Sequence, residues 1–172
     1  MKSYKELLNE ITTFIFDVDG VLTNGSVSLF NNEMVRTLSS RDAYAMQYAS
    51  KMGYDILIIT GGNSTQVKDR LLELGCNEVI LSSSIKINTY NELKKKYGFS
   101  DSQALYMGDD IPDYEVMKTV GLAACPQDAV VEIKAISHYQ SPYNGGDKCV
   151  RDVIEQTLRV QGKWFTKDAF SW

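Results

Sequence analysis

The chain has 172 residues, of which 22 are acidic and 18 are basic, and its formal net charge is −4. This length is typical of one domain with one buried core, so residues 1–172 are predicted to form a single domain. The charges are interspersed without a basic patch, which argues against a nucleic-acid partner. No apolar run approaches the roughly 20 residues that span a bilayer, and residues 1–10 do not resemble a signal peptide. Together with three widely spaced cysteines, these features predict a soluble, cytoplasmic protein without a membrane partner.

Short apolar runs alternate with helical patterns along most of the chain. The runs predict strands over residues 13–16, 56–59, 79–81, 104–107 and 122–124. They are continuous rather than alternating, as strands covered on both faces require. Helical spacing, capping residues and terminal glycines predict helices over residues 42–52, 64–74, 85–97, 112–120, 128–135 and 148–160. The alternation predicts an α/β fold, a doubly wound parallel sheet with helices on both faces.

Two segments depart from this alternation. Residues 26–38 contain two strand-like runs joined by Asn31, Asn32 and Glu33, a composition that favours a tight hairpin. The hairpin leaves the first strand beside Asp17, and it is either a simple edge hairpin or a lid or subunit contact. The C-terminal tail, residues 162–172, carries four aromatic side chains that we expect to dock on another surface, a neighbouring subunit being one candidate.

Polar side chains follow several of the predicted strands. Ligands of open parallel sheets bind outside the carboxyl ends of the strands, where these side chains converge. The rim gathers Asp17 and Asp19 after the first strand, Thr60 and Gly61 after the second, Lys86 after the third, and Asp109, Asp110 and Asp113 after the fourth. His138, the only histidine, lies beside a predicted short strand, and we expect it to be structural.

These residue types suit phosphoryl transfer. Carboxylates from two loops offer the hard oxygen ligands that Mg²⁺ prefers. One carboxylate could attack phosphorus and form an aspartyl phosphate, while a second, two residues further on, protonates the leaving oxygen and then activates water. The Thr60 hydroxyl, the Gly61 N–H and the Lys86 ammonium could stabilise the transferring group. Each residue alone has a simpler interpretation, Asp17 as a helix cap and Lys86 as a solvated surface lysine.

The motifs and their order resemble the haloacid dehalogenase superfamily. Residues 16–23, FDVDGVLT, resemble its first motif, Thr60-Gly61 the second, Lys86 the third, and residues 108–113, GDDIPD, the fourth. The resemblance implies that Asp17 is the nucleophile and Asp19 the general acid and base. It also implies Mg²⁺ held by Asp17, the Asp19 backbone carbonyl and Asp109, with Asp110 and Asp113 in support. Thr60 and Lys86 would bind phosphate, and Lys86 would also pair with Asp17.

The predicted absence of a cap domain restricts the resemblance to one family within the superfamily. Only the hairpin separates the first motif from the next helix, and residues 60–86 leave no room for a second cap. This layout is similar to the 3-deoxy-D-manno-octulosonate 8-phosphate phosphatase family, as are Arg41–Tyr44 and the Gly145-Gly146 loop. The resemblance implies hydrolysis of that sugar-acid phosphate, a precursor of lipopolysaccharide. It further implies a homotetramer in which a neighbour's surface and the C-terminal tail close each active site.

A sugar-acid phosphate also carries a carboxylate, so cationic side chains beyond Lys86 are expected. Arg41, Arg70, Lys148 and Arg151 are the candidates, and each could instead form a surface salt bridge. The chain departs from many relatives at Gly62, where they have Arg, and at Asp147-Lys148, where they have Arg-Gly or Glu-Gly.

Two other functions stay open. One is a phosphatase acting on a nine-carbon keto-sugar acid 9-phosphate, although relatives of that type tend to have Glu at the position of Gly62 and lack the match at Arg41. The other is a non-catalytic regulatory domain or phosphoacceptor. Asp19 argues against a phosphoacceptor, because a general base beside an aspartyl phosphate would make it short-lived.

Overall fold

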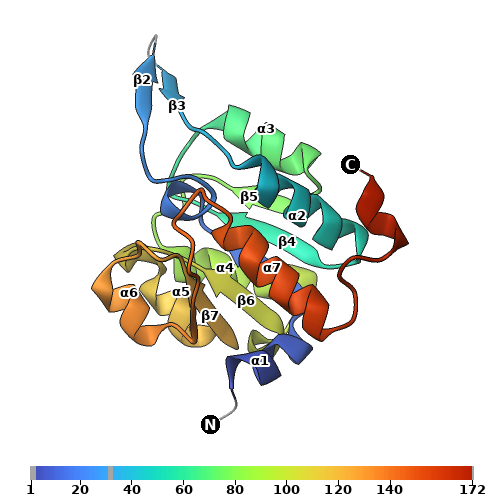
Figure 1. The fold of residues 1–172 in the computed structure, drawn as a ribbon. Coiled ribbons are helices and arrows are strands. Elements are labelled where there is room, and N and C mark those ends of the chain that lie inside the picture. Colours follow the sequence, from blue (N-terminus) through green and yellow to red (C-terminus); the bar gives the residue numbers. More distant parts are fainter. Residues whose placement is uncertain (1–2, 31–32, 172) are drawn as a thin grey trace.

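The structure is a computed structural model that describes residues 3–30 and 33–171. Within these residues a six-stranded, fully parallel sheet has the order β5-β4-β1-β6-β7-β8 (Figure 1). The doubly wound α/β fold predicted from the sequence is confirmed. The strands are β1 Thr13–Phe16, β4 Asp55–Ile59, β5 Glu78–Ile80, β6 Ala104–Met107, β7 Leu122–Cys125 and β8 Tyr139–Gln140.

Helices cover both faces of the sheet. Successive residues of β1 point to opposite faces, so Phe14 and Phe16 join one core cluster and Ile15 joins the other. The first cluster lies under α2, α3 and α7, and the second under α4, α5 and α6. The helices are α1 Tyr4–Leu7, α2 Ser40–Lys51, α3 Thr65–Glu73, α4 Lys86–Tyr97, α5 Tyr114–Thr119, α6 Val131–Ile136 and α7 Cys149–Val160. None of the described helices is long and apolar enough to cross a membrane.

Two of the predicted helices are shorter than expected. The stretch predicted as a helix over 128–135 becomes helical only at Val131, because Asp128 accepts a hydrogen bond from the Gly145 N–H and Val130 donates to the Asp109 carbonyl. The stretch predicted over 112–120 begins as a 3₁₀ turn at Ile111–Asp113, before α5. The first change joins separate loops at the carboxyl rim, and the second lets Asp113 accept the N–H groups of Asp109 and Asp110 within its own loop.

The predicted hairpin is confirmed, with shorter strands than expected. β2 Ser28–Phe30 and β3 Glu33–Val35 pair antiparallel and project from the sheet (Figure 1). Asn31 and Asn32, predicted to form its turn, lie outside the described residues. Arg36 ends the second strand early because its side chain turns back to Asp19. Between β1 and α2 the described residues form a helical turn at Val18–Leu22 and this hairpin, which agrees with the predicted layout without a cap domain.

The described part of the C-terminal tail packs on its own chain. Trp164 meets Tyr48 edge to face, with 5.3 Å between ring centroids, and Tyr48 also donates a hydrogen bond to the Lys163 carbonyl. Phe165 and Phe170 contact each other and stay 71% and 75% exposed. Trp164 therefore docks on α2, whereas the two phenylalanines face solvent, and Trp172 lies outside the described residues.

His138 attaches the last strand to the sheet. Its Nδ1 accepts the Ala123 N–H at 3.0 Å, and its own backbone N–H donates to the Ala123 carbonyl at 2.8 Å. These bonds bring β8 beside β7, which supports a structural role for the imidazole.

Candidate active site

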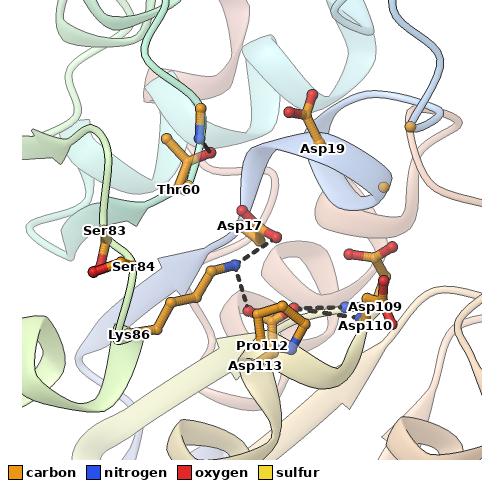
Figure 2. Close-up of a pocket in the computed structure, with 14 residues that line it drawn as sticks. Asp17, Asp19, Thr60, Ser83, Ser84, Lys86, Asp109, Asp110, Pro112 and Asp113 are labelled. Carbon is orange, nitrogen blue, oxygen red and sulfur yellow. Dashed lines mark hydrogen bonds and ion pairs between the residues drawn. The ribbon is translucent and has the colours of Figure 1, made fainter.

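A pocket of about 490 Å³ opens at the carboxyl ends of β1, β4 and β6. Among the described residues, five aspartates and one lysine line it, with glycines, hydroxyl side chains and one proline between them (Figure 2). The lining comprises Asp17, Asp19, Gly20, Gly25, Thr60, Gly61, Gly62, Ser83, Ser84, Lys86, Asp109, Asp110, Pro112 and Asp113. The fold thus brings together the residues that the sequence placed at the rim.

Asp17 is positioned by the turn that follows β1. Its Oδ1 accepts the Val18 N–H at 2.6 Å, so the carboxylate starts the turn while Oδ2 faces the pocket. Gly20 then adopts φ of +85°, in the left-handed region that glycine enters without a steric penalty. A Cβ at Gly20 would lie only 1.9 Å from Asp109 Oδ2, so the absence of a side chain lets the two loops meet.

Lys86 joins two of the carboxylates. Its Nζ lies 2.6 Å from Asp17 Oδ2 and 2.7 Å from Asp113 Oδ1, and its side chain is almost completely buried (Figure 2). The Tyr106 hydroxyl donates to the same Asp113 oxygen at 2.6 Å. A buried ammonium group held by two carboxylates has its orientation fixed before any ligand arrives.

Asp113 organises the loop after β6. Its Oδ2 accepts the N–H groups of Asp109 at 3.1 Å and Asp110 at 3.4 Å. A Cβ at Gly108 would lie 2.4 Å from Asp113 Cγ, so glycine allows this close approach. Asp110 is exposed, and its Oδ1 accepts the Ile111 N–H at 2.7 Å. Asp113 therefore holds the loop through two backbone N–H groups, while Asp110 lies at the edge of the pocket.

Burial and mutual repulsion perturb the titration of these groups. Burial, and after it the charge of Asp113, raises the pKa of Asp17 to about 6, although Lys86 opposes the rise. Burial and the charge of Asp17 raise the pKa of Asp109 to about 7. Burial alone would lower the pKa of Lys86, but Asp113 and Asp17 together raise it above its ordinary value. The carboxylates therefore carry more negative charge than Lys86 balances, which favours a bound cation.

The geometry fits a hard divalent cation. Oxygen atoms of Asp17, Asp109 and Asp113 lie within 4.8 Å of one another. Asp109 Oδ1 is buried and has no hydrogen-bond partner among the described residues, which is costly unless another group satisfies it. Since Asp113 is already occupied by Lys86, Tyr106 and two N–H groups, Asp17 and Asp109 are the carboxylates best placed to hold such an ion.

The opposite wall offers hydrogen-bond donors. Thr60 follows β4 and is buried, and its Oγ1 accepts the Gly62 N–H at 3.1 Å. Gly61, Ser83 and Ser84 line the same wall. A hydroxyl group and backbone N–H groups that line one pocket together with Lys86 form the environment that a phosphoryl group requires.

One residue at the site was not foreseen. Arg36, from the base of the hairpin, donates from Nε to Asp19 Oδ1 at 2.6 Å and from Nη2 to Asp19 Oδ2 at 3.0 Å. Hydrogen bonding to Asp19, partly opposed by burial, raises the pKa of Arg36. One weak signal for this pair was present in the sequence, a basic residue at the end of the hairpin that follows the first motif.

The other predicted cationic side chains lie outside the pocket. Arg70 is on the exposed face of α3 and pairs with Glu73 at 3.2 Å. Arg41 is exposed on the first turn of α2, whereas its neighbour Asp42 is buried. Lys148 lies over the Tyr143 ring, 4.4 Å from its centroid, in a small polar cavity that Arg151 also lines. The structure of one chain does not bring these residues to the pocket, and their contact with a substrate stays a prediction.

Comparison with known proteins agrees with this geometry. A family model described as haloacid dehalogenase-like hydrolase matches residues 74–154. The 3-deoxy-D-manno-octulosonate 8-phosphate phosphatase of Escherichia coli K12 is 33% identical over 154 residues, which cover 89% of this chain and 82% of the relative.

Solved structures are also similar. The phosphatase of the same name from Yersinia pestis superposes with a TM-score of 0.90 at 31% identity, covering 92% of this chain and 86% of that one. The enzyme from Moraxella catarrhalis was solved in complex with magnesium, phosphate and a KDO molecule. It superposes with a TM-score of 0.90 at 28% identity, and the match covers 93% of this chain and 92% of that one. The cobalt-bound enzyme from Haemophilus influenzae superposes with a TM-score of 0.90 at 26% identity, and the match covers 95% of this chain and 98% of that one.

Proposed function

Because this chain belongs to the 3-deoxy-D-manno-octulosonate 8-phosphate phosphatase family of haloacid dehalogenase-like hydrolases, we propose that it hydrolyses that sugar-acid phosphate with Mg²⁺ as its cofactor. The products are the free sugar acid, a lipopolysaccharide precursor, and inorganic phosphate. One observation carries the proposal: the buried Asp17 carboxylate is held by Lys86 and lies beside Asp109, whose buried oxygen has no partner among the described residues.

The reaction proceeds in two displacements at Asp17. In the first, an Asp17 oxygen forms a bond to phosphorus, the ester P–O bond breaks, and Asp19 gives its proton to the leaving sugar oxygen. In the second, Asp19 takes a proton from water while the water oxygen attacks phosphorus. The bond between phosphorus and Asp17 then breaks, which releases phosphate and restores both carboxyl groups.

The remaining pocket residues hold the phosphoryl group. Lys86, the Thr60 hydroxyl and the Gly61 N–H donate to its non-bridging oxygens, where negative charge gathers. Asp17 and Asp109, with the Asp19 backbone carbonyl, hold Mg²⁺, and Asp110 and Asp113 support the loop. Bound there, the ion supplies positive charge that offsets the repulsion between the phosphate and Asp17.

The test is phosphate release from 3-deoxy-D-manno-octulosonate 8-phosphate in the presence of Mg²⁺. Wild type is expected to turn over, and Asp17→Asn to lose turnover while keeping its fold by circular dichroism. Asp69→Asn, an exposed aspartate on α3, is the matched control and should behave as wild type. An active Asp17→Asn variant would rule out the aspartyl-phosphate route.

The alternatives are separated by the same assay. A marked preference for the nine-carbon keto-sugar acid 9-phosphate in kcat/KM would overturn the choice of substrate but keep the chemistry. A phosphorylated chain that survives for minutes without releasing phosphate would favour the phosphoacceptor function.

We also propose that residues 1–172 act as one cytoplasmic domain within a homotetramer whose neighbouring subunits close the active sites. Exposed apolar side chains on the hairpin, with Leu29 82% and Phe30 67% exposed, support a subunit contact. Light scattering gives the oligomeric state, and a monomer would refute the tetramer.

The tail is a candidate lid over a neighbour's site. Replacing Phe165 and Phe170 with Ser keeps the Trp164 packing on Tyr48 and removes the exposed rings. The KM of this variant should be higher than that of wild type, and its thermal stability should be unchanged. Unchanged kinetic constants would show that the exposed rings of the tail do not contribute to substrate binding. Deleting residues 162–172 is a poorer test, because it also removes the Trp164 packing.

A further inference from the structure

The ion pair between Arg36 and Asp19 lies behind one wall of the pocket. The Arg36 side chain is 5% exposed, whereas that of Asp19 is 34% exposed and lines the pocket. Two hydrogen bonds of the guanidinium go to the carboxylate, one to each oxygen. A planar fork that binds both oxygens fixes the direction of a carboxylate as well as its location. Arg36 therefore supports Asp19 without itself lining the pocket.

Apart from Arg36, one other side chain in the described part of the chain is hydrogen-bonded to Asp19. The Thr23 hydroxyl donates to Oδ1 at 3.4 Å, which is a long hydrogen bond. The other four aspartates of the pocket repel it, and Lys86, the cation among the described lining residues, already binds Asp17 and Asp113. Without Arg36 the Asp19 carboxylate would be free to turn toward Lys86 or toward a bound cation. The guanidinium keeps it separate from the other carboxylates.

The direction in which Asp19 is held suits the second displacement. Figure 2 shows its carboxylate pointing away from Asp17, and a Cβ built on Gly62 would lie 3.6 Å from Asp19 Oδ2 and 3.4 Å from Thr60 Oγ1. Asp19 thus faces the outer part of the pocket, beside Thr60. Attacking and leaving oxygens lie in line on opposite sides of phosphorus. The water that attacks a phosphoryl group on Asp17 must therefore approach from this outer side.

Gly62 leaves room for the pair. A Cβ at this position would lie 3.5 Å from Arg36 Nη2, so a longer side chain would meet the guanidinium. The hairpin contributes as well, because Arg36 follows β3 directly and its Nη1 donates to the Met34 carbonyl at 3.2 Å.

We propose that Arg36 is a positioning residue that holds the Asp19 carboxylate at the outer side of the pocket, where it takes the proton from the water that hydrolyses the aspartyl phosphate. The inference rests on the proposed function. In this step a water O–H bond breaks, its proton goes to an Asp19 oxygen, the water oxygen bonds to phosphorus, and the P–O bond to Asp17 breaks. Arg36 touches none of the reacting atoms and acts through Asp19.

The test separates the two displacements with p-nitrophenyl phosphate, whose leaving group needs little protonation. In Arg36→Ala, with Mg²⁺ present, we expect a burst of p-nitrophenolate close to one equivalent per active site. A steady state slowed by about tenfold or more should follow, since a general base typically contributes 10²–10⁴-fold. Acid quenching should trap phosphorylated protein during the slow phase. Arg36→Lys keeps the charge but lacks the planar fork. Its steady-state rate should lie between that of Arg36→Ala and that of wild type.

Further variants distinguish positioning from a structural effect. A general disturbance of the fold would slow the burst and the steady state alike, and that outcome would overturn the proposal. In an Asp19→Asn background, Arg36→Ala should slow the second phase no further, and an additional slowing would overturn it as well. Lys96→Ala, which removes a cation of α4 paired with Glu78, is the control and should match wild type. If wild type hydrolyses none of the phosphates, the proposed function fails; if wild type turns over and Arg36→Ala shows no slow phase, only the role of Arg36 fails.

Discussion

The ammonium group of Lys86 lies 2.6 Å from a carboxylate oxygen of Asp17, and both side chains are at most 10% exposed. This contact places a positive charge beside the atom that would attack phosphorus. It also balances negative charge in a region where four further aspartates line the pocket.

Replacing Lys86 with Met keeps much of the side-chain volume and removes this charge. Turnover should fall by at least about 100-fold, the usual effect of losing one donor to the transition state. Without Mg²⁺ the stability at neutral pH should fall by roughly 3–5 kcal/mol, because Asp17 and Asp113 would be buried without their cation. Steady-state assays and urea unfolding measure the two effects. Lys96→Met is the control, and near-normal turnover in Lys86→Met would contradict the assignment.

The affinity for Mg²⁺ should depend on pH. In the metal-free chain burial raises the pKa of Asp17 to about 6 and of Asp109 to about 7. The ion needs ionised carboxylates, so its binding releases protons and strengthens as pH rises through these values. Between about pH 5.5 and about pH 8 the affinity should increase by more than about tenfold. Calorimetric titration measures it, and Asp109→Asn should bind weakly and with less pH dependence. An affinity unaffected by pH would contradict the site.

Gly20→Ala should damage the site more than the fold. The new Cβ would lie 1.9 Å from Asp109 Oδ2, so Asp109 must move. Gly53→Ala is the matched control, because Gly53 also has φ of +85°, but among the described residues no atom beyond its two chain neighbours lies within 4 Å of the new methyl group. Both variants should lose roughly 1 kcal/mol from the left-handed backbone. Only Gly20→Ala should lose Mg²⁺ affinity and turnover, and equal Mg²⁺ affinity in the two variants would be the contrary result.

Asp42 links the first turn of α2 to the start of α7, and it should make stability depend on pH. Its oxygens accept the N–H groups of Arg151 at 2.7 Å and Lys148 at 3.3 Å. Burial nevertheless raises its pKa to about 6 from an ordinary value of 3.8, although the backbone hydrogen bonds oppose the rise. The folded state therefore holds this proton more tightly than the unfolded state. The resulting stability is fully present below pH 3.8 and is lost as pH rises through about 6.

Asp42→Asn isolates this contribution, because Asn does not titrate. Between about pH 4 and about pH 6 wild type should lose about 2 kcal/mol relative to the variant. Urea unfolding at the two pH values gives the difference. A gap between the two proteins that stays constant with pH would show that Asp42 is not the titrating group.

The positions of β1, β4, β5, β6 and β7 followed from the sequence because buried parallel strands need continuous apolar runs, whereas β8, Tyr139–Gln140, is not such a run. The run Phe14–Phe16 supplies both cores of the sheet by simple alternation. The start of α6 could not be foreseen, because it depends on hydrogen bonds from Gly145 to Asp128 and from Val130 to Asp109, which join residues far apart in the chain.

Some residues of the site could likewise be predicted from the sequence, and others could not. Asp17, Lys86 and Asp109 each follow a strand or begin a helix at one end of the sheet, so their meeting could be predicted from the order of elements. Arg70 was a candidate for the pocket only because it is cationic, and α3 turns it toward Glu73 and solvent. Tyr106 lies within a strand, where an apolar role was expected, and its hydroxyl reaches Asp113.

The parallel sheet, the family resemblance and the set of carboxylates at one rim could all be inferred from the amino-acid sequence alone. These features depend on periodicity and on residue order, which are local properties of the chain. The folded structure was needed to show that Arg36 supports Asp19, that a buried Asp109 oxygen has no hydrogen-bond partner among the described residues, and that Trp164 packs on Tyr48. Those contacts join segments distant in sequence, and their geometry is fixed by how loops cross and where side chains point once the core has formed.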